Sequence, residues 1–257
     1  MARRDRVAYL HRMVPRQPPR KAVALSQRLD RLDWSGIERE LAERGHARTF
    51  AVLSAGECAG LVRLYEDDAR FRSRVVMERH RFGVGEYKYF AAPLPPLVAE
   101  LRERLYPPLA TVANHWMEAL RLPERFPSRL PAFLERCARA GQAKPTPLLL
   151  RYTAGGYNCL HQDVYGDVGF PLQAAVFLSR PGRDYTGGTF LLVEQRPRAQ
   201  SVGEALLPEQ GEMVIFTNRF RPVAGTRGFY RANVRHGVSR IEAGQRMTLG
   251  IIFHNAR

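Results

Sequence analysis

Residues 151–163 read RYTAGGYNCLHQD and directly follow an apolar run, Leu148 to Leu150, that predicts a buried strand. Side chains at positions i and i+2 lie on the same face of a strand. His161 and Asp163 can therefore offer an imidazole nitrogen and a carboxylate oxygen to one point. This pair predicts a metal ion at that point.

A second histidine is needed to complete the ligand set, and His236 in RHGVSRI can supply it. Two nitrogens and one carboxylate on one face of an octahedron hold non-haem Fe(II) and leave three positions open. Ten residues after His236, Arg246 lies in the apolar strand QRMTLGIIF. Its planar donor fork can bind a carboxylate in a bidentate manner, so Arg246 is a candidate anchor for a dicarboxylate co-substrate.

The pattern of His161-x-Asp163, His236, Arg246 and Thr248 resembles the Fe(II)/2-oxoglutarate-dependent dioxygenases over roughly residues 145–257. The resemblance implies that the triad binds iron and that Arg246 binds the distal carboxylate of 2-oxoglutarate. It also implies hydrogen bonds to this co-substrate from Tyr152 and Thr248, for which a purely structural role is the alternative. In such enzymes O2 and 2-oxoglutarate are consumed, a substrate C–H bond is hydroxylated, and succinate and CO2 are released.

Short apolar strands separated by Gly and Pro turns follow Asp163, at residues 171–178, 189–194 and 213–216. Such strands predict a β-sandwich or jelly roll, which the resemblance names as a double-stranded β-helix. Apolar periodicity predicts helices over residues 23–32, 36–44, 96–120 and 131–140, and the capping box of Ser54 and Glu57 predicts another helix start. We therefore expect an α+β protein with a basic arm (1–22), a helical extension packed on one sheet (23–144) and a dioxygenase core (145–257).

Residues 72–90 predict a hairpin in which basic and aromatic side chains alternate. Cationic side chains neutralise phosphates, and aromatic faces stack on bases. We therefore expect a substrate lid, although the aromatic residues could instead face the core while the charges face water. A second basic stretch, 219–246, contains seven arginines and one acid, Glu242. The candidate substrate contacts from both stretches are Arg79, Arg81, Tyr87, Lys88, Arg219 and Arg221.

The formal net charge of +15 favours anionic partners such as single-stranded or alkylated DNA or RNA, with general arginine enrichment as the alternative. No apolar run approaches the ~20 residues of a membrane-spanning helix, and the basic start has no apolar core of a secretory signal. We therefore expect a cytoplasmic protein that has no membrane association and no obligate protein partner.

The substrate is open among three hypotheses. RYTAGGYNCLHQD resembles the RYxxGxxxxLHQD segment of the AlkB-type nucleic-acid demethylases, and over its whole length the chain is similar to a bacterial family assigned to oxidative demethylation of damaged DNA, a form of DNA repair. The short interval from His236 to Arg246 instead resembles the prolyl-hydroxylase branch, which implies a protein or peptide substrate. A non-catalytic, cupin-like binding module is the third hypothesis, and the complete triad together with Arg246 argues against it.

Overall fold

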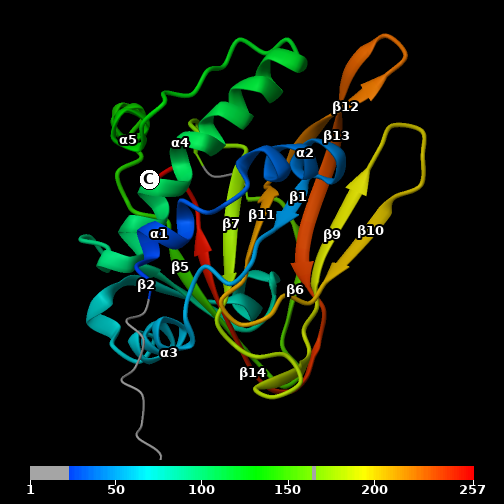
Figure 1. The fold of residues 1–257 in the computed structure, drawn as a ribbon. Coiled ribbons are helices and arrows are strands. Elements are labelled where there is room, and N and C mark those ends of the chain that lie inside the picture. The colour runs from blue at the N-terminus through cyan, green and yellow to red at the C-terminus, as the bar shows by residue number, and fades with distance from the viewer. Residues whose placement is uncertain (1–22, 164–165) are drawn as a thin grey trace, which may run out of the picture.

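Two antiparallel sheets form the body of the protein, and helices cover the outer side of one of them (Figure 1). The computed structural model describes residues 23–163 and 166–257, so the predicted basic arm lies outside the described residues. The jelly-roll class expected from the strand pattern is confirmed. The helices are α1 (Leu25–Leu29), α2 (Trp34–Arg44), α3 (Ala55–Leu64), α4 (Pro96–Ala119) and α5 (Leu130–Arg139), with two 3-10 turns, η1 (Asp68–Arg70) and η2 (Met77–His80).

The larger sheet has eight strands in the order β1-β11-β7-β14-β5-β4-β2, and β8 pairs with β14. It includes strands from both halves of the chain, because β1, β2 and β4 precede residue 145. The strands are β1 (His46–Arg48), β2 (Phe71–Val76), β4 (Glu86–Phe90), β5 (Leu148–Thr153), β7 (Leu172–Phe177), β8 (Tyr185–Gly187), β11 (Met213–Thr217) and β14 (Ile241–Ile251).

The smaller sheet has six strands in the order β10-β9-β13-β6-β3, and β12 pairs with β13. The hairpins β9–β10 and β12–β13 extend beyond the rest of the body (Figure 1). The strands are β3 (Gly83–Val84), β6 (Tyr157–His161), β9 (Phe190–Gln195), β10 (Val202–Leu206), β12 (Phe220–Gly225) and β13 (Gly228–Val238).

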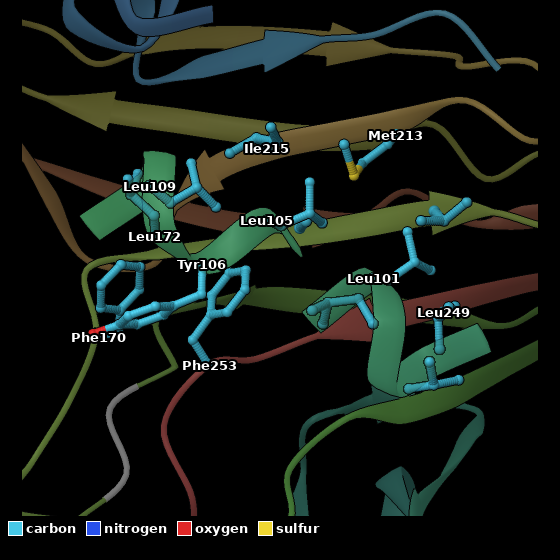
Figure 2. Packing of buried hydrophobic residues seen from close by; sticks show 14 of the residues in the cluster. Leu101, Leu105, Tyr106, Leu109, Phe170, Leu172, Met213, Ile215, Leu249 and Phe253 are labelled. Atoms are coloured by element: carbon cyan, nitrogen blue, oxygen red, sulfur yellow. The ribbon is translucent and has the colours of Figure 1, made fainter. Parts of the chain in front are cut away.

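Helix α4 packs its apolar side against the larger sheet (Figure 2). Leu101, Leu105 and Leu109 recur every four residues, so they lie on one face of the helix, and all three are fully buried. Burial of each such side chain contributes about 1.5–3 kcal/mol. Figure 2 shows them facing apolar residues of β7, β11 and β14. This layer fixes the positions of the strands that form the floor of the cavity described below.

Alternation along β14 divides its side chains between the two faces of the larger sheet. Met247, Leu249 and Ile251 belong to the apolar core that contains α4. Arg246 and Thr248 lie on the opposite face and line a cavity between the sheets. The helical layer on one face therefore determines which residues of β14 are presented to the cavity on the other.

Several local expectations are confirmed. The Ser54 side chain accepts a hydrogen bond from the Glu57 backbone, and Glu57 caps the Ser54 backbone in return. Strands β2 and β4 form the predicted hairpin, but η2 and β3 lie between them, and β3 crosses over to pair with β6 of the smaller sheet.

The first helix is shorter than the predicted range 23–32, since α1 covers only Leu25–Leu29. Within residues 23–163 and 166–257, no helix combines the length and apolarity needed to cross a membrane.

Candidate active site

His161, Asp163 and His236 lie at one end of the cavity, and their ligand atoms all lie within 4.8 Å of one another. His161 ends β6, and His236 lies directly opposite it in β13 through the antiparallel register. His161 Nε2 is 3.5 Å from Asp163 Oδ1, and His236 Nε2 is 3.2 Å from Asp163 Oδ2. The structure thus brings together the three residues that the sequence pattern selected.

A glutamine that the sequence reasoning missed supports this group. Gln173 of β7 is buried, and its Nε2 donates a hydrogen bond of 2.8 Å to Asp163 Oδ2. The same nitrogen lies 3.4 Å from His236 Nε2. The sequence did contain a signal for this role, since Gln173 is the polar residue in the otherwise apolar run Leu172–Phe177. A buried amide in a strand needs polar partners.

The electrostatics of the group couple the protonation of the two histidines to the Asp163 carboxylate. Burial lowers the pKa of His236, so its imidazole is neutral near neutral pH. Burial alone would raise the pKa of Asp163, but its interactions with His236 and His161 hold it well below its ordinary value. Burial alone would lower the pKa of His161, but its hydrogen bond to Asp163 raises that pKa above its ordinary value. Metal ligands of these types must be a neutral imidazole and an ionised carboxylate.

The backbone around His161 fixes the orientation of its ring. His161 Nδ1 lies 2.8 Å from the carbonyl oxygen of Cys159. In the neutral ring that binds a metal, donation from Nδ1 to this carbonyl leaves the lone pair on Nε2, the atom that faces Asp163. The donor set and its tautomer therefore fit Fe(II), with two imidazole nitrogens and one carboxylate directed at one point.

Arg246 lies in the same cavity, which has a volume of about 360 Å³. Only 2% of the surface of Arg246 is exposed. Its Nη1 donates to Thr248 Oγ1 at 2.9 Å, whereas Nε and Nη2 are buried without a hydrogen-bond partner within 3.5 Å. The buried Tyr185 hydroxyl interacts with the guanidinium from beyond that distance. No carboxylate of the described residues forms an ion pair with it, and burial lowers its pKa. A buried donor without a partner costs about 1–3 kcal/mol, so the site is suited to receive an anionic group.

Tyr152 is fully buried and lines the cavity between the triad and Arg246. Its hydroxyl accepts a hydrogen bond of 3.2 Å from Asn158 Nδ2, and burial raises its pKa to about 12. The guanidinium of Arg246 lies 5.7 Å from the centre of the Tyr152 ring and 5.1 Å from that of Phe177. Tyr152 is thus a core residue that also lines the cavity.

The predicted lid lies at the cavity, since Met77, Arg81, Phe82 and Tyr87 are among the residues that line it. Arg79 and Arg81 are exposed, as is Phe82, whose ring stacks on His80 at 5.3 Å between centroids. Tyr87 is half-buried, and burial raises the pKa of its hydroxyl. Arg79 and Arg81 are therefore exposed to solvent, whereas the half-buried Tyr87 lines the cavity.

Two of the expected substrate contacts require correction. Lys88 is buried on the opposite face of β4 from Tyr87, and its Nζ donates to Tyr65 O and to Asp68 Oδ1 at 2.6 Å. Arg221 is buried, forms an ion pair with Glu194 and donates to Ala42 O at 2.6 Å. Both cations are already neutralised inside the protein, so neither is available to a substrate. Arg219, by contrast, is exposed.

Comparisons with known proteins agree with this geometry. A family model described as "Oxygenase, catalysing oxidative methylation of damaged DNA" matches residues 85–256. An uncharacterized protein of Mycobacterium tuberculosis, found in two strains, is 44% identical over 190 residues, which cover 72% of this chain and 82% of the relative.

Among solved structures, a Pseudomonas putida prolyl-4-hydroxylase superposes with a TM-score of 0.50 at 16% identity, covering 87% of this chain and 99% of that chain. A Trichoplax adhaerens prolyl hydroxylase, solved with a hypoxia inducible factor peptide, gives a TM-score of 0.50 at 13% identity, with 90% and 92% covered. At these identities the two structural similarities establish the fold alone.

Proposed function

The chain belongs to the oxygenase family described by its action on damaged DNA, and from that membership we propose an Fe(II)- and 2-oxoglutarate-dependent oxygenase that demethylates alkylated nucleic acid. In the proposed reaction a C–H bond of an alkyl group on a base is hydroxylated, while 2-oxoglutarate is converted to succinate and CO2. The oxygenase class follows from the family. The metal, the co-substrate and the substrate are the parts that we propose.

The donor set of His161, Asp163 and His236 supports iron as the metal. Iron bound together with 2-oxoglutarate would supply activation of O2, coupled to decarboxylation of the co-substrate. The protein's own contribution is to hold three ligand atoms on one side of the site and leave the cavity side open. Gln173 would keep the Asp163 carboxylate oriented through its hydrogen bond to Oδ2.

One observation carries the proposal of a dicarboxylate co-substrate: Arg246 is buried in the same cavity as the triad and has two donor atoms without partners. A carboxylate can accept from both atoms in the bidentate geometry that guanidinium favours. Thr248 accepts from Nη1 and so fixes the plane of the guanidinium. The Tyr152 hydroxyl could donate a further hydrogen bond to the same ligand.

The mouth of the cavity supports an aromatic, anionic substrate. Phe82 and Leu160 are large apolar side chains that are 47% and 41% exposed, and both line the cavity. Arg79 and Arg81 lie beside Phe82 in sequence and are exposed. Stacking of a base on an aromatic side chain contributes about 1–3 kcal/mol, and arginine can contact the adjoining phosphates.

A second candidate is hydroxylation of a protein or peptide side chain, of which prolyl hydroxylation is one type. The observations that favour it are the ten-residue interval between His236 and Arg246 and the likeness of the fold to prolyl hydroxylases. The basic, aromatic mouth favours nucleic acid over this alternative, since proline-containing peptides carry no repeating negative charge.

The test is succinate formation by the iron-loaded protein with three additions: an oligonucleotide with a methylated base, the same oligonucleotide unmethylated, and a proline-rich peptide. We expect the methylated oligonucleotide alone to stimulate turnover and to release formaldehyde in equal amount. The His236→Ala variant provides the blank. Stimulation by the peptide instead would replace the proposed substrate, and absence of iron-dependent consumption of 2-oxoglutarate under all conditions would reject the proposed co-substrate.

A further inference from the structure

One exposed face of the β12–β13 hairpin carries a row of arginines that no acidic residue neutralises. Arg227 lies in the turn, and Arg231 and Arg235 follow at intervals of four residues on β13. Because strand side chains alternate, Arg231 and Arg235 lie on the same face of β13, and Arg227 lies beyond them in the turn. All three are exposed, and none forms an ion pair with the residues that the structure describes. The sequence contains no Asp or Glu between residues 219 and 241.

The row leads to the candidate active site. Arg235 directly precedes His236, which points to the opposite, buried face of β13. Gln162, a residue of the cavity lining, donates hydrogen bonds to the carbonyls of Arg219 at 2.7 Å and Val234 at 2.9 Å. These bonds join the mouth of the cavity to the start of the hairpin. The row itself lies on the outer face of the smaller sheet, so a ligand that enters the cavity reaches the row by passing around the sheet at Gln162, where β6 ends and β12 begins.

The outer half of the hairpin is an ordered, two-stranded ribbon. β9 pairs with β13 only over residues 233–238, whereas β12 pairs with it from Gly228 to Asn233. Buried Arg221 binds both Glu194 of β9 and the Ala42 carbonyl of α2, which fixes the base of the ribbon. The ribbon then projects from the body, as Figure 1 shows. Its position relative to the cavity is thus held by internal contacts.

Aromatic side chains accompany the arginines. Phe229 is 53% exposed and lies two residues before Arg231, on the same face of β13. The guanidinium of Arg231 lies 5.2 Å from the centre of the Phe220 ring on the neighbouring strand. Arginine with exposed aromatic faces is the combination that binds phosphates and bases together. Charge alone would also fit an acidic peptide, but the aromatic faces favour a nucleic acid.

We propose that this hairpin face binds the sugar-phosphate backbone of a nucleic-acid strand beyond the reacting nucleotide, so that the substrate is a polymer that extends from the cavity to the hairpin turn. The inference rests on the proposed function, because the strand is the one whose base enters the cavity. From Arg227 to Arg235 the strand rises about 26 Å at ~3.3 Å per residue. A single strand stacked as in a duplex, at ~3.4 Å of axial spacing per phosphate, spans this distance with roughly eight nucleotides, and a more extended strand spans it with fewer.

The test compares binding of methylated single-stranded oligonucleotides of increasing length, with the methylated base near one end. We expect wild-type affinity to rise at least tenfold, up to about eight nucleotides beyond that base. In the triple variant Arg227→Ala/Arg231→Ala/Arg235→Ala this gain should be lost. The slope of log affinity against log salt concentration should fall in magnitude by about 2, since each of the three phosphate contacts contributes ~0.7 for single strands.

The matched control is Arg31→Ala/Arg129→Ala/Arg139→Ala, which removes the same charge from exposed arginines of the helical side that form no ion pair in the described residues. It should keep both the length dependence and the salt slope. Iron affinity reports whether each variant is folded, and Arg227→Ala/Arg231→Ala, confined to the ribbon, replaces the triple variant if that variant is unfolded.

The outcomes separate this inference from the proposed function. Wild-type turnover of the methylated base with no change of length dependence in the triple variant would overturn the hairpin surface and leave the function standing. An equal loss in the control variant, or competition by polyglutamate as strong as by an oligonucleotide of equal charge, would also overturn it. Absence of any stimulation of wild-type turnover by nucleic acid would instead reject the proposed function.

Discussion

Replacing Arg246 by methionine should weaken 2-oxoglutarate binding and, in the absence of 2-oxoglutarate, make the protein more stable. Two of the buried guanidinium nitrogens, Nε and Nη2, have no partner in the structure without ligand. Each such donor costs about 1–3 kcal/mol, while methionine fills a similar space without a polar atom. We expect the free energy of unfolding to rise by about 1–2 kcal/mol, or about 2–8 °C in Tm.

The loss in co-substrate affinity follows from the same two atoms. Each charge-assisted hydrogen bond contributes about 1.5–3 kcal/mol, so two of them at the lower bound give about 3 kcal/mol. This corresponds to a roughly 150-fold higher Kd for 2-oxoglutarate, since about 1.4 kcal/mol is a factor of ten. Ligand present at 100 times its Kd stabilises a protein by about 2.7 kcal/mol. That thermal shift should be present in the wild type and nearly absent in Arg246→Met at the same concentration.

Arg102 provides the matched control, because it is also an arginine buried to 3% exposure but its donors are used. Its Nε donates to Ile252 O at 3.0 Å, and its Nη2 donates to Phe253 O at 2.8 Å and to the Asn255 side chain at 2.9 Å. Arg102→Met leaves these acceptors unpaired and should lower Tm while leaving the affinity for 2-oxoglutarate unchanged.

The measurements are isothermal titration with 2-oxoglutarate in the presence of a redox-inert divalent metal, and thermal unfolding with and without ligand. Unchanged co-substrate affinity in Arg246→Met would move the anchor to another residue. A loss of stability as large as that of Arg102→Met would refute the reasoning that Arg246 is uncompensated in the absence of ligand.

Three further predictions concern the metal group and its surroundings. His161→Ala and Asp163→Ala should each abolish Fe(II) binding in anaerobic titration, because each removes one of the three candidate ligands, and full affinity in both would remove the site. Gln173→Leu should lower Co(II) affinity about 10- to 100-fold through loss of its hydrogen bond to Asp163, whereas unchanged affinity would make Gln173 a packing residue. Burial lowers the pKa of His254 from 6.5 to about 4, so between these values the unfolded chain binds a proton that the folded protein does not. The free energy of unfolding should therefore fall by roughly 3 kcal/mol as the pH drops through this window. His254→Asn keeps an acceptor for the Phe170 backbone and should reduce this slope in denaturant titrations, and an equal slope in the variant would contradict the assignment.

Local sequence determined the elements whose formation depends on near neighbours. The capping box at Ser54 and the apolar repeat of α4 specify helices through contacts within one or two turns. The His161-x-Asp163 spacing directs both side chains to one point because strand side chains alternate. The grouping with His236 was also predictable, since few residue types form such a ligand set and the spacing to Arg246 restricted the choice.

Partners that are distant in sequence were decided only by the tertiary structure. Arg219 and Arg221 belong to the same basic stretch, yet one is exposed and the other is neutralised by Glu194 of β9. Lys88 lies between two tyrosines of the cavity side but is turned to the opposite face, where Asp68 and the Tyr65 carbonyl bind it. The role of Gln173 depends on β7 lying beneath Asp163. Whether a charge is free to bind a substrate depends on which acceptors surround it after folding, and strand alternation alone does not specify which face of a sheet becomes the interior.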